Sequence, residues 1–398
     1  MAKRPKQALD HLYSKSACCA APSAIREINK LVDSPGMRSL AGGWPDPAVF
    51  PADDIFRIAN EQLGQHADIV LQYGATEGLR ELRQELARMS TANYGIKCSL
   101  DHILITAGSA QGMDLACRVI IDPGEVIFVG LPTYFGGTGA VMATCGELQG
   151  VAVDDDGMNT RHLADQLQAL KNSGKRAKGI YVIPNFQNPT GATLSLERRR
   201  HLVELAERYD LIIFEDDPYG DLRFEGEHLP PIMSLDTGGR VVHMRSTSKT
   251  FAPGLRVAWT IGPPEMIRKM VVAKQFVDIA TNTLAQHILL EFIRSGLLEK
   301  RIVLNNKHYK RKRDFMLEQL DIHFPEQVRW NHPAGGFFIF VRLPETMDAS
   351  ELLGEAIEHQ VAFVAGEPFF IDHSGTHTFR LSYSQSGESV IAEAVAEL

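Results

Sequence analysis

The sequence has few cysteines, no long hydrophobic run and no excess of basic residues. Its five cysteines are odd in number and form no Cys-x-x-Cys pair, in a chain of 398 residues that is long enough to bury a core without disulfides. The 41 Lys and Arg residues against 49 Asp and Glu residues give a net charge of -8, so no chain-wide basic field exists to attract a phosphate backbone. We therefore expect neither disulfides nor a nucleic-acid partner.

Membrane and metal sites are also poorly supported. No segment approaches the roughly 18 to 20 consecutive apolar residues of a membrane helix, and the polar N-terminal segment lacks the apolar core of a signal peptide. The 14 histidines include no His-Glu-x-x-His or comparable spacing. The sequence thus predicts a soluble, cytoplasmic, globular protein with no metal site and no membrane partner.

The central part of the chain shows the alternation that is typical of an α/β fold. From about residue 100 to 262, short runs rich in Val and Ile alternate with segments of helical periodicity, as expected of strands that helices bury on both faces. Thr160 and Ser195 are the predicted N-caps of two of these helices. Seven strands are predicted for one mostly parallel sheet, at residues 103–106, 126–129, 150–153, 179–183, 211–214, 241–244 and 257–261. Only about ten residues without a helical pattern separate the last two strands, so one of them should run antiparallel.

The remaining C-terminal part has a different order of elements. A long helical stretch is followed by a strand, a helix and two more strands, at residues 284–320, 337–341, 350–359, 361–364 and 378–382. We predict a smaller α+β domain, with domain limits at 1–48 (an N-terminal arm and part of the small domain), 49–290 (the large domain) and 291–398 (the small domain). A basic run on the long helix is predicted to be a solvated face; it consists of Lys307, Lys310, Arg311, Lys312 and Arg313.

Lys249 is the first candidate for chemistry. It ends a Ser-Thr-Ser-Lys segment (residues 246–249) that directly follows a predicted buried strand, and Pro-Gly-Leu-Arg (253–256) comes shortly afterwards. A lysine at the carboxyl end of such a strand faces a crevice. Its amine, with hydroxyls before it and a guanidinium after it, suits a Schiff base to an aldehyde that carries a phosphate. An ordinary surface loop explains this segment by itself equally well.

Three further segments follow predicted strands of the same sheet. Glu-Asp-Asp-Pro-Tyr (215–219) places acids at the end of a strand, where one carboxylate can pair with a pyridinium nitrogen and make the ring an electron sink. Asn188 in Gln-Asn-Pro-Thr-Gly (187–191) can donate a hydrogen bond to a phenolate oxygen, and Gly-Ser-Ala-Gln-Gly (108–112) opens a helix whose first amides form an anion site. Each segment alone is also explained as a common turn.

In this order, the four segments together resemble those of the fold-type I pyridoxal-phosphate-dependent aminotransferases of class I/II. The likeness runs from Leu-Ala-Gly-Gly-Trp-Pro-Asp-Pro (40–47) to Phe-Arg-Leu-Ser-Tyr (379–383), so it covers nearly the whole chain, and it is nearest to the α-aminoadipate and kynurenine aminotransferase branch. The resemblance implies an α/β enzyme of fold type I whose large domain binds pyridoxal 5'-phosphate. It also implies a homodimer that moves an amino group between an L-amino acid and a 2-oxo acid.

The resemblance further implies a role for individual residues. Lys249 would form the internal aldimine and move a proton between the substrate Cα and the cofactor C4′, Asp216 would pair with the pyridine nitrogen, and Tyr219 would help to hold the ring oxygen. The other implied cofactor contacts are Ser109, Ala110, Ser246, Ser248 and Arg256 at the phosphate, Tyr134 on the ring face, Asn188 at the ring oxygen, and Tyr73 reaching the phosphate from a partner subunit. The implied substrate contacts are Arg380 at the α-carboxylate, with Gly42, Asn188, Trp44 and Arg26.

Three positions depart from the family pattern. Gly130-Leu131 stands where an acidic residue is usual, Ala365-Gly366 replaces a common Pro-Gly, and Trp44 replaces a smaller aliphatic residue. Trp44 is explained equally well as a wall of the substrate pocket and as a packed surface aromatic. The sequence therefore leaves the amino donor and acceptor open.

Two other functions compete with transamination. The same lysine-bound cofactor supports β- or γ-elimination, decarboxylating deamination or oxidation, as in natural-product biosynthesis, because small pocket changes decide the fate of the carbanion. An effector-binding module of a transcription regulator is the weaker alternative, since only about 25 residues precede the aminotransferase-like region. We expect transamination.

Overall fold

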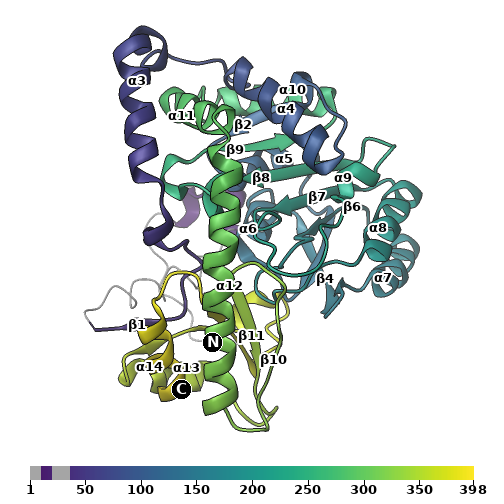
Figure 1. The fold of residues 1–398 in the computed structure, drawn as a ribbon. Coiled ribbons are helices and arrows are strands. Elements are labelled where there is room, and N and C mark those ends of the chain that lie inside the picture. Colours follow the sequence, from purple (N-terminus) through teal and green to yellow (C-terminus); the bar gives the residue numbers. More distant parts are fainter. Residues whose placement is uncertain (1–9, 20–35) are drawn as a thin grey trace.

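The computed structural model describes residues 10–19 and 36–398 of the chain. Within these residues the largest sheet has eight strands (Figure 1). Their order across the sheet is β2 (Ile103–Thr106), β9 (Ala258–Ile261), β8 (Val241–Ser246), β7 (Ile212–Asp217), β6 (Ala177–Val182), β3 (Val126–Leu131), β4 (Glu147–Asp154) and β5 (Gly157–Met158). The strands from β8 to β4 run parallel, whereas β9 is antiparallel to both its neighbours and β5 is antiparallel to β4.

The seven predicted strands are all present, and β9 is the antiparallel strand that the short connection predicted. The prediction missed β5, a two-residue edge strand that pairs with the end of β4. Its turn depends on Gly157, which adopts φ +87°, a conformation that glycine allows without strain. Two residues are too few for a hydrophobic pattern, so no periodicity could indicate this strand.

Helices cover both faces of the large sheet. The side chains of Ile127 and Phe128, neighbours on β3, enter different hydrophobic clusters, as expected when successive residues of a strand face opposite sides. One cluster includes buried residues of α5 (Ser109–Ile120) and α10 (Pro264–Gln275), and the other includes those of α7 (Thr160–Ser173) and α8 (Leu196–Tyr209). A third cluster joins β2 and β9 to α3 (Ala52–Val70), α4 (Arg80–Tyr94) and α11 (Thr283–Arg294). The shorter helices of this part are α6 (Phe135–Ala143) and α9 (Ile232–Leu235), and α1 (Lys15–Cys19) lies near the N-terminus.

Two predicted helix limits are wrong. The N-cap of α7 is Asn159, whose side chain accepts from the amides of residues 161 and 162 at 3.2 and 3.0 Å, so Thr160 is the first helical residue. The long helical stretch is two helices, α11 and α12 (Leu297–His323), because Gly296 between them adopts a left-handed φ of +67°. Ser195 is the N-cap of α8, as predicted.

A second sheet lies beside the lower half of α12, which in Figure 1 runs vertically from the level of the large sheet down past the second one. Its strands are all antiparallel, in the order β10 (Arg329–Trp330), β11 (Phe338–Arg342), β14 (Thr378–Ser382) and β13 (Val364–Ala365). The predicted strand 361–364 is divided between β13 and β12 (Val361–Ala362), which pairs in parallel with β1 (Arg38–Ser39). Helices α13 (Ala349–Glu358) and α14 (Glu388–Glu397) complete this part. The domain limits at residues 48 and 290 stay a prediction.

The basic run on α12 is only partly a solvated face. Lys312 and Arg313 are 2% and 0% exposed. The Lys312 Nζ donates to Oδ2 of Asp46 at 2.7 Å and to the carbonyl of Ser384 at 2.7 Å, and Arg313 donates to the carbonyl of Pro333 at 2.7 Å. Arg313 also pairs with the carboxylates of Glu225 and of the neighbouring Asp314, so both buried charges have a charged partner.

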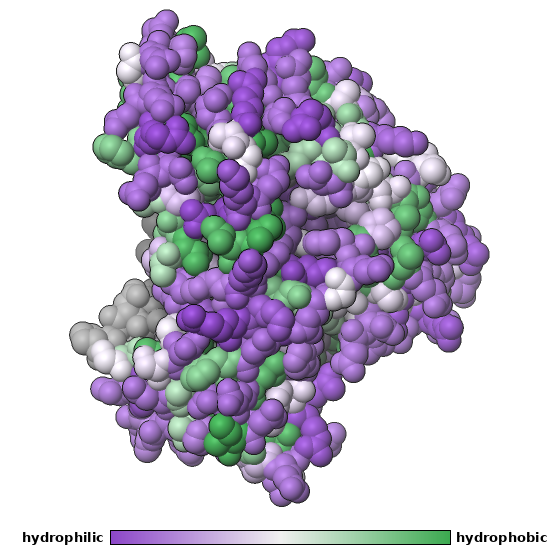
Figure 2. Space-filling view, viewed as in Figure 1, coloured by the Kyte–Doolittle hydropathy of each residue, from purple (hydrophilic) through white to green (hydrophobic). Residues whose placement is uncertain are grey.

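Most large apolar side chains are buried, and the face seen in Figure 2 is mainly hydrophilic, with apolar residues in separate groups. None of the helices described is both long enough and apolar enough to span a lipid bilayer.

Candidate active site

The segments predicted to carry chemistry converge on one cavity at the carboxyl ends of the parallel strands. The cavity has a volume of about 520 Å³. The predicted residues that line it are Gly42, Trp44, Ser109, Ala110, Tyr134, Asn188, Asp216, Tyr219, Ser246, Ser248, Lys249, Arg256 and Arg380. Strand ends of a mostly parallel α/β sheet are the usual place for a ligand crevice, and the second sheet contributes Arg380 from β14.

Lys249 lies at the end of a short 3-10 turn, η4 (Thr247–Lys249), directly after β8. Its Nζ donates a hydrogen bond to the carbonyl of Gly43 at 2.9 Å and lies 5.7 and 5.8 Å from the ring centroids of Tyr219 and Phe337. Burial, together with the positive charges of Arg380 and Arg256, lowers the pKa of Lys249 to about 8. A large fraction of this amine is therefore neutral near pH 8, as a nucleophile requires.

Two of the three consecutive acids on β7 have structural partners outside the cavity. Glu215 accepts hydrogen bonds from two amides of α9 at 2.7 and 3.0 Å, and lies 2.8 Å from Nδ1 of His243. Asp217 accepts from Asn185 at 2.9 Å and lies 3.3 Å from Arg245. Neither residue lines the cavity.

Asp216 is the acid of this group that does line the cavity. Its Oδ2 accepts a hydrogen bond from the hydroxyl of Tyr181 at 3.0 Å. Its Oδ1 is buried without a hydrogen-bond partner among the described residues. Burial raises the pKa of Asp216 to about 6, although the Tyr181 hydrogen bond acts in the opposite direction. A buried carboxylate oxygen without a donor is the acceptor that a protonated ring nitrogen needs.

An anion site lies where α5 begins. Helix α5 follows Gly108 and has no side-chain cap, so the amides of Ser109 and Ala110 lie at an uncapped N-terminus. Gly108 has φ +94°, and a Cβ at this position would lie 2.0 Å from Nη2 of Arg256. The glycine thus lets the guanidinium lie across the helix N-terminus, where its Nη2 also donates to the carbonyl of residue 107 at 3.0 Å.

Hydroxyl groups complete this anion site. Ser246 donates to Oγ of Ser248 at 2.8 Å, and Arg256 lies 3.4 Å from the same oxygen. The positive guanidinium, two hydroxyls and the helix N-terminus together match what a phosphate monoester requires.

Arg380 also lines the cavity and is held there by several contacts. Its side chain is 2% exposed, and its Nη1 and Nη2 donate to Oδ1 of Asn188 at 2.7 Å and to the carbonyl of Ala41 at 2.5 Å. The guanidinium carbon lies 4.2 and 5.2 Å from the ring centroids of Phe338 and Phe369. Its Nε is buried without a partner among the described residues, so a donor is left for a ligand. Burial lowers the pKa of Arg380 to about 10, and the group remains charged at neutral pH.

Trp44 forms part of the cavity wall, which favours its interpretation as a wall of the substrate pocket over that as a packed surface aromatic. It is 41% exposed, so the indole lies at the rim. A Cβ on Gly42 would lie 2.9 Å from this ring, and glycine therefore permits the close approach. Sequence reasoning missed other cavity residues, among them Phe135, Ile183 and Phe338. Phe135 could have been predicted because it directly follows Tyr134 in the sequence. Phe338 lies on a strand of the other sheet, and nothing in the sequence around it indicated that it lines the cavity.

Not every predicted position lies in the cavity. Tyr73 follows α3 on the surface and is 81% exposed. Gly130 and Leu131 at the end of β3 do not line the cavity either. Arg26 lies outside the described residues, so its role stays a prediction.

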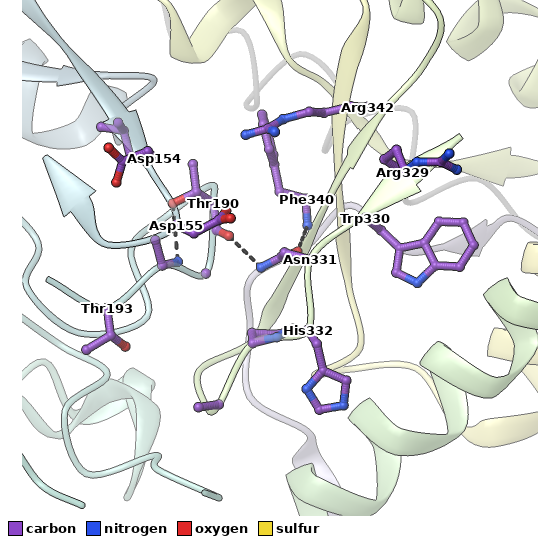
Figure 3. Close-up of a pocket in the computed structure, with 15 residues that line it drawn as sticks. Asp154, Asp155, Thr190, Thr193, Arg329, Trp330, Asn331, His332, Phe340 and Arg342 are labelled. Carbon is purple, nitrogen blue, oxygen red and sulfur yellow. Dashed lines mark hydrogen bonds between the residues drawn. The ribbon is translucent and has the colours of Figure 1, made fainter. Parts of the chain in front are cut away.

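A second cavity, of about 540 Å³, lies between the loop after β6 and the strands β10 and β11 (Figure 3). Asn331 bridges its two sides, because its Nδ2 donates to the carbonyl of Thr190 at 2.7 Å and its Oδ1 accepts from the amide of Phe340 at 2.7 Å. The lysine and Asp216 of the first cavity do not reach this space, so we place the chemistry in the first cavity.

Comparisons with known proteins agree with this geometry. The family model described as aminotransferase class I and II matches residues 53–398. The chain is 42% identical over 386 residues to aromatic-amino-acid aminotransferase 1 of Thermococcus litoralis, covering 97% of this chain and 93% of that protein. It is 35% identical over 389 residues to the 2-aminoadipate transaminase of Thermus thermophilus, covering 97% and 95%. The crystal structure of a Pyrococcus horikoshii kynurenine aminotransferase, solved with PMP, KYN and KYA, superposes with a TM-score of 0.94 at 41% identity, covering 98% of this chain and 96% of that one. The chain therefore belongs to the class I and II aminotransferases, and it is a pyridoxal-phosphate-dependent aminotransferase of fold type I.

Proposed function

We propose that this aminotransferase moves the amino group of an L-amino acid with an aromatic or other large apolar side chain to a 2-oxo acid such as 2-oxoglutarate, with Lys249 as nucleophile and proton carrier. One observation carries the proposal. The amine of Lys249, the carboxylate of Asp216 and the guanidinium of Arg380 line a single cavity, which also contains an anion site, and Oδ1 of Asp216 has no hydrogen-bond partner in the part of the chain that the structure describes.

The residues of the cavity fit pyridoxal phosphate. Ser109, Ala110, Ser246, Ser248 and Arg256 would hold the phosphate, because they provide an uncapped helix N-terminus, hydroxyls and a guanidinium. At the other end, Asp216 would accept from the ring nitrogen, Tyr219 and Asn188 would donate to the ring oxygen, and Tyr134 would stack on the ring. When bound, the cofactor supplies a protonated ring that withdraws the electron pair left at the substrate Cα.

Lys249 has two tasks in this proposal. Its neutral amine, which the depressed pKa of about 8 favours, would hold the cofactor by condensing with its aldehyde carbon with loss of water. Once a substrate amine had taken its place, the same Nζ would accept the proton from the substrate Cα and return it at C4′. The ring centroids of Tyr219 and Phe337 lie 5.7 and 5.8 Å from this amine and 5.8 Å from each other, so both rings lie on one side of the amine and make that side apolar.

The walls of the cavity support a large apolar substrate side chain. Arg380 would bind the α-carboxylate with two hydrogen bonds, which its planar fork suits. The remaining wall includes Trp44, Phe135, Ile183 and Phe338. The cations that line the described part of the cavity are Lys249, Arg256 and Arg380, each already assigned to another group. An acidic side chain, such as that of 2-oxoglutarate, would therefore need Arg26, as the resemblance implies.

We also propose that the active unit is a homodimer and that Tyr73 crosses to the partner's phosphate site. Large apolar side chains are exposed on α3 and in the segment that follows it, and others follow α10. They are Phe56, Ile69, Leu71 and Tyr73 in the first group, and Phe276, Val277 and Ile279 in the second, each at least 50% exposed. Exposed apolar groups of this size commonly mark a protein interface. A cytoplasmic location stays a prediction.

A half-reaction experiment tests the proposed substrates. The holoenzyme is incubated with L-phenylalanine, L-tyrosine, L-2-aminoadipate, L-aspartate or L-alanine, and the visible absorption of the lysine-bound cofactor is followed. We expect the aromatic donors to convert it fastest to the pyridoxamine form, and 2-oxoglutarate to restore it.

The same experiment separates transamination from its rivals. The names of the relatives favour transamination over elimination, decarboxylating deamination or oxidation. Release of ammonia or carbon dioxide without a pyridoxamine form would contradict the proposed reaction. Equal rates for aspartate and phenylalanine would contradict only the proposed substrate class.

A further inference from the structure

Tyr181 lies behind Asp216 and is not part of the cavity wall. It is on β6, and β6 pairs with β7 so that Tyr181 is opposite Phe214, two residues before Asp216 and on the same face of the sheet. The Tyr181 side chain is 0% exposed, and its hydroxyl donates to Oδ2 of Asp216 at 3.0 Å. A buried hydroxyl commonly has such a partner, but this one is bonded to the carboxylate that the mechanism requires.

A glycine of α6, Gly137, lies against the hydroxyl end of the Tyr181 ring. A Cβ at Gly137 would lie 2.2 Å from Cζ and 2.5 Å from the hydroxyl oxygen of Tyr181. Only a residue without a side chain therefore lets the first turn of α6 lie this close to the ring. Gly139, in the same helix, has open space around the equivalent position, so the contact at Gly137 is specific to that site.

We propose that Tyr181 is a positioning residue for the reaction: its hydroxyl fixes Oδ2 of Asp216, which leaves Oδ1 facing the ring nitrogen of the cofactor, and Gly137 keeps the Tyr181 ring in place. The inference rests on the proposed role of Asp216. Three observations carry it: the hydrogen bond to one carboxylate oxygen, the absence of a partner for the other among the described residues, and the close approach of Gly137.

The hydrogen bond has an electrostatic effect as well as a steric one. Burial raises the pKa of Asp216, and donation from Tyr181 opposes this change by stabilising the ionised form. An ionised Asp216 keeps the proton on the ring nitrogen, and a protonated ring is the better electron sink. Asp217, His243 and Lys249 also act on Asp216 through their charges, and they are unchanged in the variants below.

The decisive variant is Tyr181→Phe, which keeps the ring and removes the hydroxyl. A hydrogen bond to a charged group typically changes an equilibrium or a rate by roughly tenfold to a hundredfold when it is lost. We expect kcat to fall by roughly this factor, while the KM of the amino donor changes little because Arg380 is untouched. Gly137→Ala should have the same signature, whereas Gly139→Ala, the matched control, should retain normal kinetics.

Two further readouts distinguish positioning from a general effect on folding. The affinity of the apoenzyme for pyridoxal phosphate should fall in Tyr181→Phe and Gly137→Ala. The visible absorption of the bound cofactor changes when Lys249 Nζ loses its proton, and the pH midpoint of this change should rise in both variants. The reason is that a ring nitrogen that holds its proton less firmly repels the proton on Nζ less. Thermal unfolding should show that Gly137→Ala and Gly139→Ala are both folded, since alanine favours a helix over glycine.

A double-mutant cycle with Asp216→Asn completes the test. If Tyr181 acts through Asp216, Tyr181→Phe should cost little further activity in the Asp216→Asn background. Additive losses, or a Tyr181→Phe enzyme with normal kcat and absorption, would overturn the inference. If Asp216→Asn itself were fully active, the proposed role of Asp216 would be wrong, which is a different result.

Discussion

Replacing Arg380 by lysine tests how the substrate carboxylate is bound. In the structure the Arg380 guanidinium lies 4.2 Å from the Phe338 ring centroid and 5.2 Å from that of Phe369, and donates to Asn188 and the carbonyl of Ala41. Lysine keeps the positive charge, but it cannot form two parallel hydrogen bonds to a carboxylate and has no planar group to stack on the rings.

The size of the effect follows from these lost contacts. A hydrogen bond to a charged group contributes about 1.5 to 3 kcal/mol, and a buried cation–π contact contributes about 1 to 2 kcal/mol. Since lysine retains part of each, we expect a loss of about 2 to 4 kcal/mol in transition-state binding, which is roughly a 30- to 1000-fold fall in kcat/KM.

Steady-state kinetics with the amino donor and the 2-oxo acceptor varied in turn provide the assay. Both KM values should rise in Arg380→Lys, because the two substrates share the carboxylate. Arg342→Lys is the matched control: Arg342 lies on the adjacent strand β11, is exposed, and faces the second cavity (Figure 3). Unchanged KM values for both substrates of Arg380→Lys, or an equal loss in the control, would refute the reasoning.

Four further predictions concern the cofactor and the substrate pocket. Lys249→Ala should have no detectable turnover, and borohydride reduction of the wild-type holoenzyme followed by peptide mapping should find the pyridoxyl group on Lys249 and on no other lysine. Burial and nearby positive charges lower the pKa of Lys249 to about 8, so the fraction of neutral amine increases as the pH rises through this value. The rate at which the apoenzyme takes up the cofactor should therefore rise with pH, with a midpoint near pH 8. A midpoint near the pKa of a free lysine would contradict this. Gly108→Ala places a Cβ 2.0 Å from Nη2 of Arg256 at a φ of +94° and should displace the guanidinium. Cofactor binding, measured by equilibrium titration, should weaken by roughly tenfold to a hundredfold. Gly254→Ala is the control, because a Cβ at Gly254 meets open space and the variant should bind the cofactor normally. Trp44→Ala should raise the KM of aromatic donors by roughly fivefold, because about 1 kcal/mol of contact between the rings is lost. The KM of alanine should stay unchanged. Equal shifts for both donors would show that Trp44 does not touch the substrate side chain.

The sequence by itself determined the parts of the fold that depend on neighbouring residues. Strands buried on both faces show as short Val- and Ile-rich runs, and all seven predicted runs are strands of the large sheet. The short link before β9 also indicated the antiparallel strand. Because loops at the carboxyl ends of parallel strands meet at one edge, motifs after these strands identified most of the cavity.

Tertiary structure decided whatever depends on partners that are distant in the sequence. Lys312 looked like part of a solvated basic face, but it is buried because Asp46, 266 residues away, accepts a hydrogen bond from it. Local pattern alone could not tell which of the three acids of β7 faces the cavity, since that depends on the partners of Glu215 and Asp217. The same is true of Tyr181, an apolar-looking residue inside a strand pattern, whose hydroxyl has a function only because sheet pairing brings it within 3.0 Å of Asp216.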